Sequence, residues 1–129
     1  PAPYKLTSKI LVHAVDLVQV LTRQAPHAVK FGICSSPGHR WENNKYGHKH
    51  DKKDKWDGMV VVYVHQAAVA CSWLETALID HFRLDTSFSK PTDNNRFQCV
   101  MRNIRDGSDS ESTGPPPHFA YFVYRSLGG

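Results

Sequence analysis

The stretch VKFGICSSPGHRWEN, Val29–Asn43, is the part of the chain from which its fold is best approached. It opens with Val29–Cys34, whose apolar, aromatic and β-branched residues favour a short strand. Ser35 or Ser36 then offers a side-chain oxygen to cap a short helix. Pro37 follows at the first helical position, where proline is best tolerated. The stretch therefore predicts a strand that leads directly into a helix.

The expected helix carries His39, Arg40 and Trp41 and should end near Gly47. An arginine in a first helical turn is usually a solvated surface charge. Its planar fork also suits the oxygens of a phosphate, however. Whether Arg40 has a function depends on which other side chains the fold places beside it.

Three further elements follow from periodicity on either side of this stretch. A helix is predicted from Thr7 or Ser8 to about Ala25, with one apolar face. Met59–His65, MVVVYVH, is a β-branched run typical of a buried strand. Gln66–Arg83 is predicted as the longest reliable helix.

The C-terminal third contributes two more strands and a loop. Phe97–Ile104 alternates well enough for a strand, and the composition of His118–Leu127, HFAYFVYRSL, favours another. The residues between them, Asp106–Pro117, have the composition of a flexible loop. We therefore expect one domain over residues 1–129, of the α+β class, with a small, mostly antiparallel sheet flanked by helices.

The overall composition is that of a globular protein, with 40% hydrophobic and 22% charged residues. No apolar run approaches the roughly 20 residues of a membrane span, and the N-terminus does not have the pattern of a secretory signal. Cys34, Cys71 and Cys99 form no CxxC pair, which favours a reducing compartment, the cytoplasm or nucleus. The net charge of +4 weakly favours anionic partners. The first residue is proline, so we expect a chain that is either trimmed at its N-terminus or a piece of a longer protein.

Glu75 is the most unusual residue of the predicted helix Gln66–Arg83. It lies in an otherwise apolar stripe at helical spacing, formed by Cys71, Leu74, Glu75, Leu78, Ile79 and Phe82. A carboxylate there is costly to bury unless a partner or a ligand compensates for it. It is either an edge residue that reaches water, or a metal ligand or general acid–base group. With Arg40 for a phosphate, it suggests a Mg²⁺ site of one carboxylate plus substrate oxygens.

The order and spacing of these features resemble the GIY-YIG nuclease superfamily. Gly32 and Arg40 are eight positions apart and Arg40 and Glu75 are 35 apart, as the family spaces its glycine, arginine and glutamate. The phrase FGICSSPGHRW is similar to the family pattern IGITxNPxxRW. The resemblance covers roughly residues 28–96 and implies a GIY-YIG-like fold.

The chain departs from the family pattern in two places. Lys30 stands where the family keeps the tyrosine of its second signature strand. The first signature strand should precede Val29–Cys34, but a helix is predicted there. HFAYFVYRS, with Tyr121 and Tyr124, is the segment that resembles the missing strand. We therefore expect a circular permutation in which His118–Leu127 pairs antiparallel with Val29–Cys34.

The resemblance implies metal-dependent hydrolysis of a phosphodiester in nucleic acid, with DNA expected ahead of RNA. Glu75 would hold Mg²⁺ or Mn²⁺, Arg40 would steady the scissile phosphate, and Lys30 would stand at the signature tyrosine. A tyrosine or histidine often follows the family's arginine by one helical turn, but Asn44 occupies that place and cannot act as a base. The remaining candidates for handling the water are Tyr121, Tyr124, His39, His48 and His50.

The loop HKHDKKDKWD, residues 48–57, mixes six basic or histidine residues with three aspartates. It is either a solvated loop or a weak binding surface for phosphates. The candidates for contact with nucleic acid are Trp41, Lys45, Lys49, Lys52, Lys53 and Lys55.

Two other classes of function stay open. A non-catalytic domain on the same scaffold would bind nucleic acid, with Trp41, Tyr46 and Trp56 stacking on bases, or would bind a protein. A zinc module would use Cys34, His39, His48 and His50, although their spacing matches no standard finger.

Overall fold

A four-stranded sheet of order β2–β4–β1–β3 forms the centre of the molecule. The computed structural model describes residues 3–24, 26–43, 47–52, 55–84, 99–101 and 114–127. The strands are β1 (His27–Cys34), β2 (Gly58–His65), β3 (Cys99–Met101) and β4 (His118–Ser126). β4 is antiparallel to both of its neighbours, and β3 is parallel to β1. The predicted α+β class with a mostly antiparallel sheet is confirmed.

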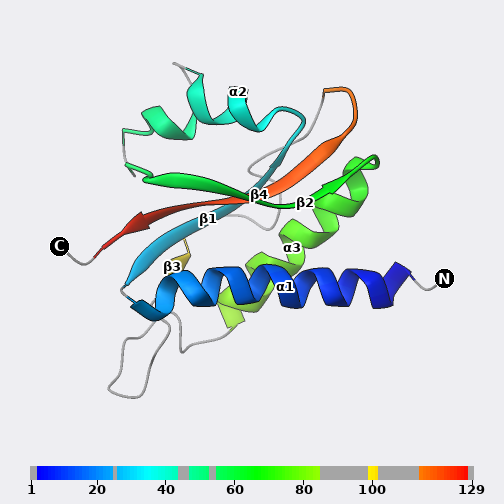
Figure 1. Ribbon diagram of the computed structural model, residues 1–129, viewed down its shortest axis with the longest axis horizontal. Coiled ribbons are helices and arrows are strands. Elements are labelled where there is room, and N and C mark those ends of the chain that lie inside the picture. The colour runs from blue at the N-terminus through cyan, green and yellow to red at the C-terminus, as the bar shows by residue number, and fades with distance from the viewer. Residues whose placement is uncertain are drawn as a thin grey trace.

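Helices cover both faces of this sheet (Figure 1). They are α1 (Pro3–Gln24), α2 (Pro37–Glu42), the short 3₁₀ helix η1 (His48–His50) and α3 (Ala68–Leu84). α1 and α3 lie against one face, and α2 lies over the other. Since β1 leads directly into α2, the strand fixes where this helix begins.

The C-terminal strand occupies the middle of the sheet. β4 pairs with the whole length of β1, from His27 opposite Ser126 to Cys34 opposite Phe119. Its other edge pairs with β2, with a register shift between Val61 and Tyr63. The predicted antiparallel pairing of the last strand with β1 is confirmed.

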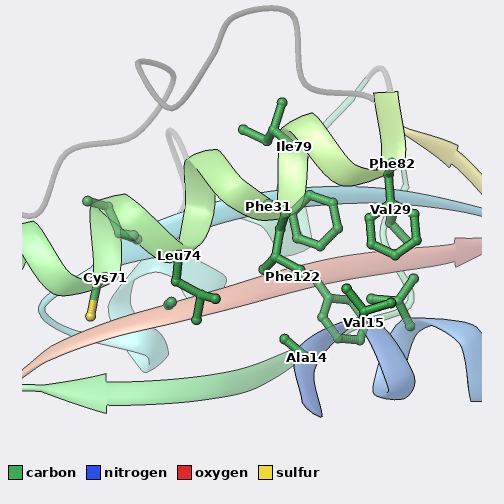
Figure 2. Close-up of a cluster of buried hydrophobic side chains, with 13 residues drawn as sticks. Ala14, Val15, Val29, Phe31, Cys71, Leu74, Ile79, Phe82 and Phe122 are labelled. Atoms are coloured by element: carbon green, nitrogen blue, oxygen red, sulfur yellow. The ribbon is translucent and has the colours of Figure 1, made fainter. Parts of the chain in front are cut away.

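The larger core lies between the sheet and the pair α1 and α3 (Figure 2). The apolar stripe predicted on α3 faces this core, and each of its residues is buried. Phe31 of β1 is central to it, stacking on Phe82 with ring centroids 5.5 Å apart and meeting Phe122 edge-on at 6.3 Å. Burial of an aromatic side chain stabilises a fold by roughly 1.5–3 kcal/mol, so this trio holds α3 against the sheet.

A smaller core lies on the opposite face, beneath α2. Alternate residues of a strand point to opposite faces, so Tyr121 and Val123 enter this cluster while Phe122 enters the larger one. Trp56, 5% exposed, packs here, and Trp41 of α2 packs against the cluster from outside. This second core anchors the helix that carries Arg40.

Several element boundaries differ from expectation. α1 begins at Pro3, so the predicted cap at Thr7 or Ser8 is wrong; proline is well suited to a first helical turn. α2 ends at Glu42, well before Gly47, because the next residue, Asn43, leaves the helical conformation with ψ of 131°.

β2 is only partly buried, although a buried strand is predicted there. It has the outer position in the sheet, and Val61 and Val64 are 39% and 49% exposed. Of the predicted strand Phe97–Ile104, the described residues cover Cys99–Met101, which do form β3. Most of the predicted loop Asp106–Pro117 lies outside the described residues.

Candidate active site

Tyr121 is the centre of the candidate site. It lies midway along β4, opposite Gly32 of β1, and its side chain is 1% exposed. Its hydroxyl lies 2.7 Å from Nε2 of His48, a residue 73 positions away in the sequence. The two rings meet at a tilt of 60°, with centroids 5.4 Å apart. A buried phenol is thus held by a buried imidazole.

Both members of this pair are held in their neutral forms. Burial, followed by the positive charges of Lys30 and Arg40, lowers the pKa of His48 from 6.5 to about 4, although Asp51 opposes the shift. Burial also raises the pKa of Tyr121, an effect that Arg40 opposes and that Cys34 and Glu75 increase. At neutral pH the pair is therefore an uncharged imidazole hydrogen-bonded to an uncharged phenol.

Gly47 sets the position of His48. Its backbone N–H donates to the carbonyl oxygen of Asn43 at 2.8 Å, which turns the chain back after α2. A Cβ at Gly47 would lie 2.5 Å from the backbone N and O of Asn43 and 2.6 Å from the carbonyl oxygen of Trp41. Only glycine fits there without a shift of the backbone. Gly47 therefore helps to place His48 against Tyr121.

Arg40 is positioned by the start of α2. Ser36 caps the helix by accepting a hydrogen bond from the backbone N–H of His39 (3.4 Å), and Pro37 follows it, as predicted. Arg40 then donates its own backbone N–H to the carbonyl oxygen of Ser36 at 3.0 Å. Its side chain is half-buried, and its charge acts on Tyr121, His48 and the thiol of Cys34.

Glu75 influences the same phenol through its charge, from α3 on the opposite face of the sheet. It belongs to the buried stripe of α3 and is 1% exposed, which excludes the interpretation of an edge carboxylate that reaches water. Its negative charge raises the pKa of Tyr121. Arg40 and Glu75 thus come from helices on opposite faces of the sheet and act on one buried tyrosine. Lys30, half-buried on β1, adds a positive charge that reaches His48.

Two predicted candidates lie elsewhere. Tyr124 points to the opposite face from Tyr121, where it packs against the larger core and lines an apolar groove with Leu17 and Leu21 of α1. A Cβ at Gly58 would come within 2.6 Å of its hydroxyl oxygen, so the side chain of Tyr124 packs closely over Gly58 of β2. His39 is exposed, with its Nε2 atom 3.4 Å from the amide nitrogen of Asn43.

The sequence did not separate His48 from the other histidines of its loop. HKH offers two histidines in three residues, and only the fold turns His48 inward and His50 outward. The glycine immediately before His48 was the available signal, because a glycine in a polar segment marks a tight turn or a close backbone contact.

The predicted basic surface is present in part. Lys49, Lys52 and Lys55 are exposed, and Lys49 forms an ion pair with Glu42 at 3.6 Å. Lys45, Lys53 and Tyr46 lie outside the described residues. Trp41 is half-buried.

Trp56, a predicted stacking residue of the non-catalytic alternative, is buried instead. Its indole N–H donates to Asp51 Oδ2 at 3.0 Å. It is a core residue and cannot stack on a base, so this part of the alternative is wrong.

The sequence offers Glu75 as a ligand for a hard cation and a separate set of four residues for zinc. Among the described residues, which include all four of the proposed zinc ligands, no group of three His, Cys, Asp or Glu side chains could hold a metal ion. Glu75 supplies a single carboxylate, the kind of ligand that Mg²⁺ and Mn²⁺ take together with water and substrate phosphates. The residues present therefore fit the expected ion and do not fit zinc.

Comparison of the chain with protein-family models, with curated proteins and with solved structures gives no match. Within the described part of the chain, no helix has the length and apolar character needed to cross a membrane.

Proposed function

We propose that this domain hydrolyses phosphodiesters in nucleic acid and is a circularly permuted relative of the GIY-YIG nucleases. The observation that carries the proposal is the buried contact between Tyr121 and His48, whose side chains lie 2.7 Å apart, together with the charges of Arg40 and Glu75 that both act on Tyr121. The antiparallel pairing of β4 with β1 supports the permutation, because it gives the last strand the position expected of the family's first.

In this proposal Arg40 binds the scissile phosphate and Glu75 holds a Mg²⁺ or Mn²⁺ ion. The guanidinium can make two parallel hydrogen bonds to phosphate oxygens. The bound ion would supply electrostatic stabilisation of the charge that develops on those oxygens. Lys30 adds a positive charge on the same face, which favours an anionic substrate there.

Tyr121 and His48 handle the water. When the phenol of Tyr121 donates to Nε2 of His48, the phenol oxygen can accept a proton from water while the phenol proton passes to His48. When Nε2 of His48 instead donates to the phenol oxygen, Nδ1 of His48 is the atom that accepts the proton from water. In either direction the imidazole is uncharged at neutral pH and has a lone pair that can accept a proton in the reaction, although its pKa of about 4 makes it a weak base. The pair therefore supplies the base that Asn44 cannot.

The test is metal-dependent nicking of plasmid DNA by Glu75→Gln. This change keeps the shape of the side chain and removes its charge, so cleavage should vanish while the fold and binding to nucleic acid persist. Asp80→Asn is the matched control, since Asp80 is an exposed carboxylate on the same helix, and it should cleave like the wild type. Full Mg²⁺-dependent cleavage by Glu75→Gln would refute the assignment. Binding without cleavage by the wild-type protein would favour the non-catalytic alternative.

A further inference from the structure

A groove of about 370 Å³ lies between α2 and the start of β2, on the face of the sheet that carries Tyr121. Its walls include the indole of Trp41 and the apolar side chains of Met59 and Val61. Asp57 also lines it and is exposed. The groove thus combines flat, apolar walls with one negatively charged hydrogen-bond acceptor.

Asp57 is held in place by β4. Its backbone N–H donates to the carbonyl oxygen of Tyr124 at 2.7 Å, and its Oδ2 atom accepts the backbone N–H of Ser126 at 2.9 Å. A carboxylate fixed in this way can accept hydrogen bonds from a ligand without first being ordered. It also repels phosphate, so the phosphate of a nucleotide in this region should lie away from Asp57 and toward a positive charge such as Arg40.

The groove and the proposed phosphate site share the helix α2. Trp41 follows Arg40 directly in α2, and both Trp41 and Met59 pack against the small core that contains Tyr121. A base stacked on an aromatic ring gains affinity whatever its identity, and a carboxylate accepts from the amino group of a base edge. The chemistry that fits is a flat ring with N–H donors, attached to a phosphate.

We propose that this groove binds an unpaired nucleobase bearing an exocyclic amino group, next to the phosphate held by Arg40. The proposal rests on the proposed function, since it takes Arg40 as the phosphate site. A paired base offers its donor edge to its partner and is stacked within the duplex, so it must be unpaired or extruded to enter. The substrate class is therefore nucleic acid with an unpaired cytosine, adenine or guanine beside the cut, in preference to thymine.

Gly38 provides a test that leaves the core untouched. It lines the groove, and a Cβ added there would meet nothing within 4 Å. Gly38→Leu should fill the groove without a clash, and Gly38→Ala is the matched control that leaves it open. Binding is measured without divalent metal, using a labelled single-stranded oligodeoxycytidine and an abasic oligomer with the same number of phosphates.

The wild type and Gly38→Ala should bind the oligodeoxycytidine roughly tenfold more tightly than the abasic oligomer. Gly38→Leu should lose that ratio and keep its affinity for the abasic oligomer. Asp57→Asn should reduce the preference for oligodeoxycytidine over oligothymidine. Equal affinity of the wild type for the cytidine and abasic oligomers, or an unchanged ratio in Gly38→Leu, would overturn the proposal.

The two proposals fail separately. Metal-dependent nicking without any preference for bases in the binding assay would overturn the proposal for the groove and leave the proposed nuclease function standing. The opposite outcome is a protein that does not nick plasmid but has a base preference that Gly38→Leu abolishes. It would support the proposal for the groove and overturn the proposed nuclease function.

Discussion

Glu75 and His48 differ from most residues of their type in being almost completely buried, at 1% and 9% exposed. Buried ionisable groups are costly, and residues with strongly shifted pKa values gather at functional sites. Glu75 acts on Tyr121 through its charge, and His48 acts on the same side chain through a hydrogen bond. Both therefore act on Tyr121, the tyrosine of β4 whose side chain lies on the same face of the sheet as α2.

Replacement of Arg40 by lysine tests whether its fork shape matters. Lysine keeps the charge but offers a single point of contact, so a bidentate phosphate contact is lost. We expect Arg40→Lys to lower the cleavage rate on the order of 10²-fold, as seen when a preorganised donor is removed. Arg23→Lys, on the exposed side of α1, should leave the rate unchanged. A rate in Arg40→Lys equal to that of the wild type would make Arg40 a surface charge.

The lowered pKa of His48 predicts a stability that falls in acid. Folded His48 binds a proton only near pH 4, whereas the unfolded residue binds one near 6.5, so the unfolded chain takes up more protons between these values. The free energy of unfolding should therefore fall by up to about 3 kcal/mol as the pH drops through this window.

Urea denaturation at several pH values measures this effect. His48→Gln retains a hydrogen-bonding group for Tyr121 and does not titrate, so it should lack this part of the pH dependence. Parallel curves for the wild type and His48→Gln would show that the neutral imidazole is not buried as described.

Residue-scale prediction succeeded where a local pattern was enough and failed where the partner was distant. The apolar stripe of α3 was such a pattern and is buried, although it left open whether Glu75 reaches water, which the structure excludes. Tyr121 and Tyr124 could not be separated until the face of β4 was known, because alternate positions on a strand look alike in composition. His48 depends on a contact across 73 residues, which no local pattern contains.

At the scale of elements, β4 determines whether the sheet exists. It joins β1 and β2, which pair with it on its two edges, and it contributes buried side chains to both cores. Removal of all residues after Gly114 should therefore unfold the domain, with loss of the far-ultraviolet circular dichroism signal and of any cooperative thermal transition. Removal of Gly128 and Gly129 alone is the control and should leave the melting curve unchanged. A truncated chain that stays folded would contradict the central role of this strand.

The sequence predicted these elements better than it predicted their ends. β-branched and aromatic runs identified β1, β2 and β4, and helical spacing identified α1 and α3. The end of α2 was missed because Asn43, not Gly47, is where the backbone leaves the helix. The exposure of β2 was missed because a run such as MVVVYV reads the same at the edge of a sheet as in its middle.

At the scale of the whole molecule, the net charge of +4 and the lysines of residues 48–57 predict weak, salt-dependent binding of nucleic acid. With aspartates among the lysines, about two or three phosphates should be neutralised, which gives a slope of about −2 to −3 for log K against log salt concentration. Fluorescence anisotropy with a short duplex between low and moderate salt measures it.

Replacement of Lys49, Lys52 and Lys55 by glutamine is the matched comparison, because all three side chains are exposed. The slope should become shallower by roughly one for each phosphate contact removed. A slope near zero in the wild type would turn the interpretation toward a protein partner.

The place of β4 also fixes the order in which the molecule can be assembled as it is translated. β1 and β2 emerge from the ribosome long before the strand that separates them, and each must wait with an open edge that only β4 can close. Open edges with runs such as MVVVYV pair readily with other chains. Nascent copies should therefore depend on chaperones until His118–Ser126 has been made. Tyr121 arrives with that strand, so no chain has a complete candidate site before its sheet is closed.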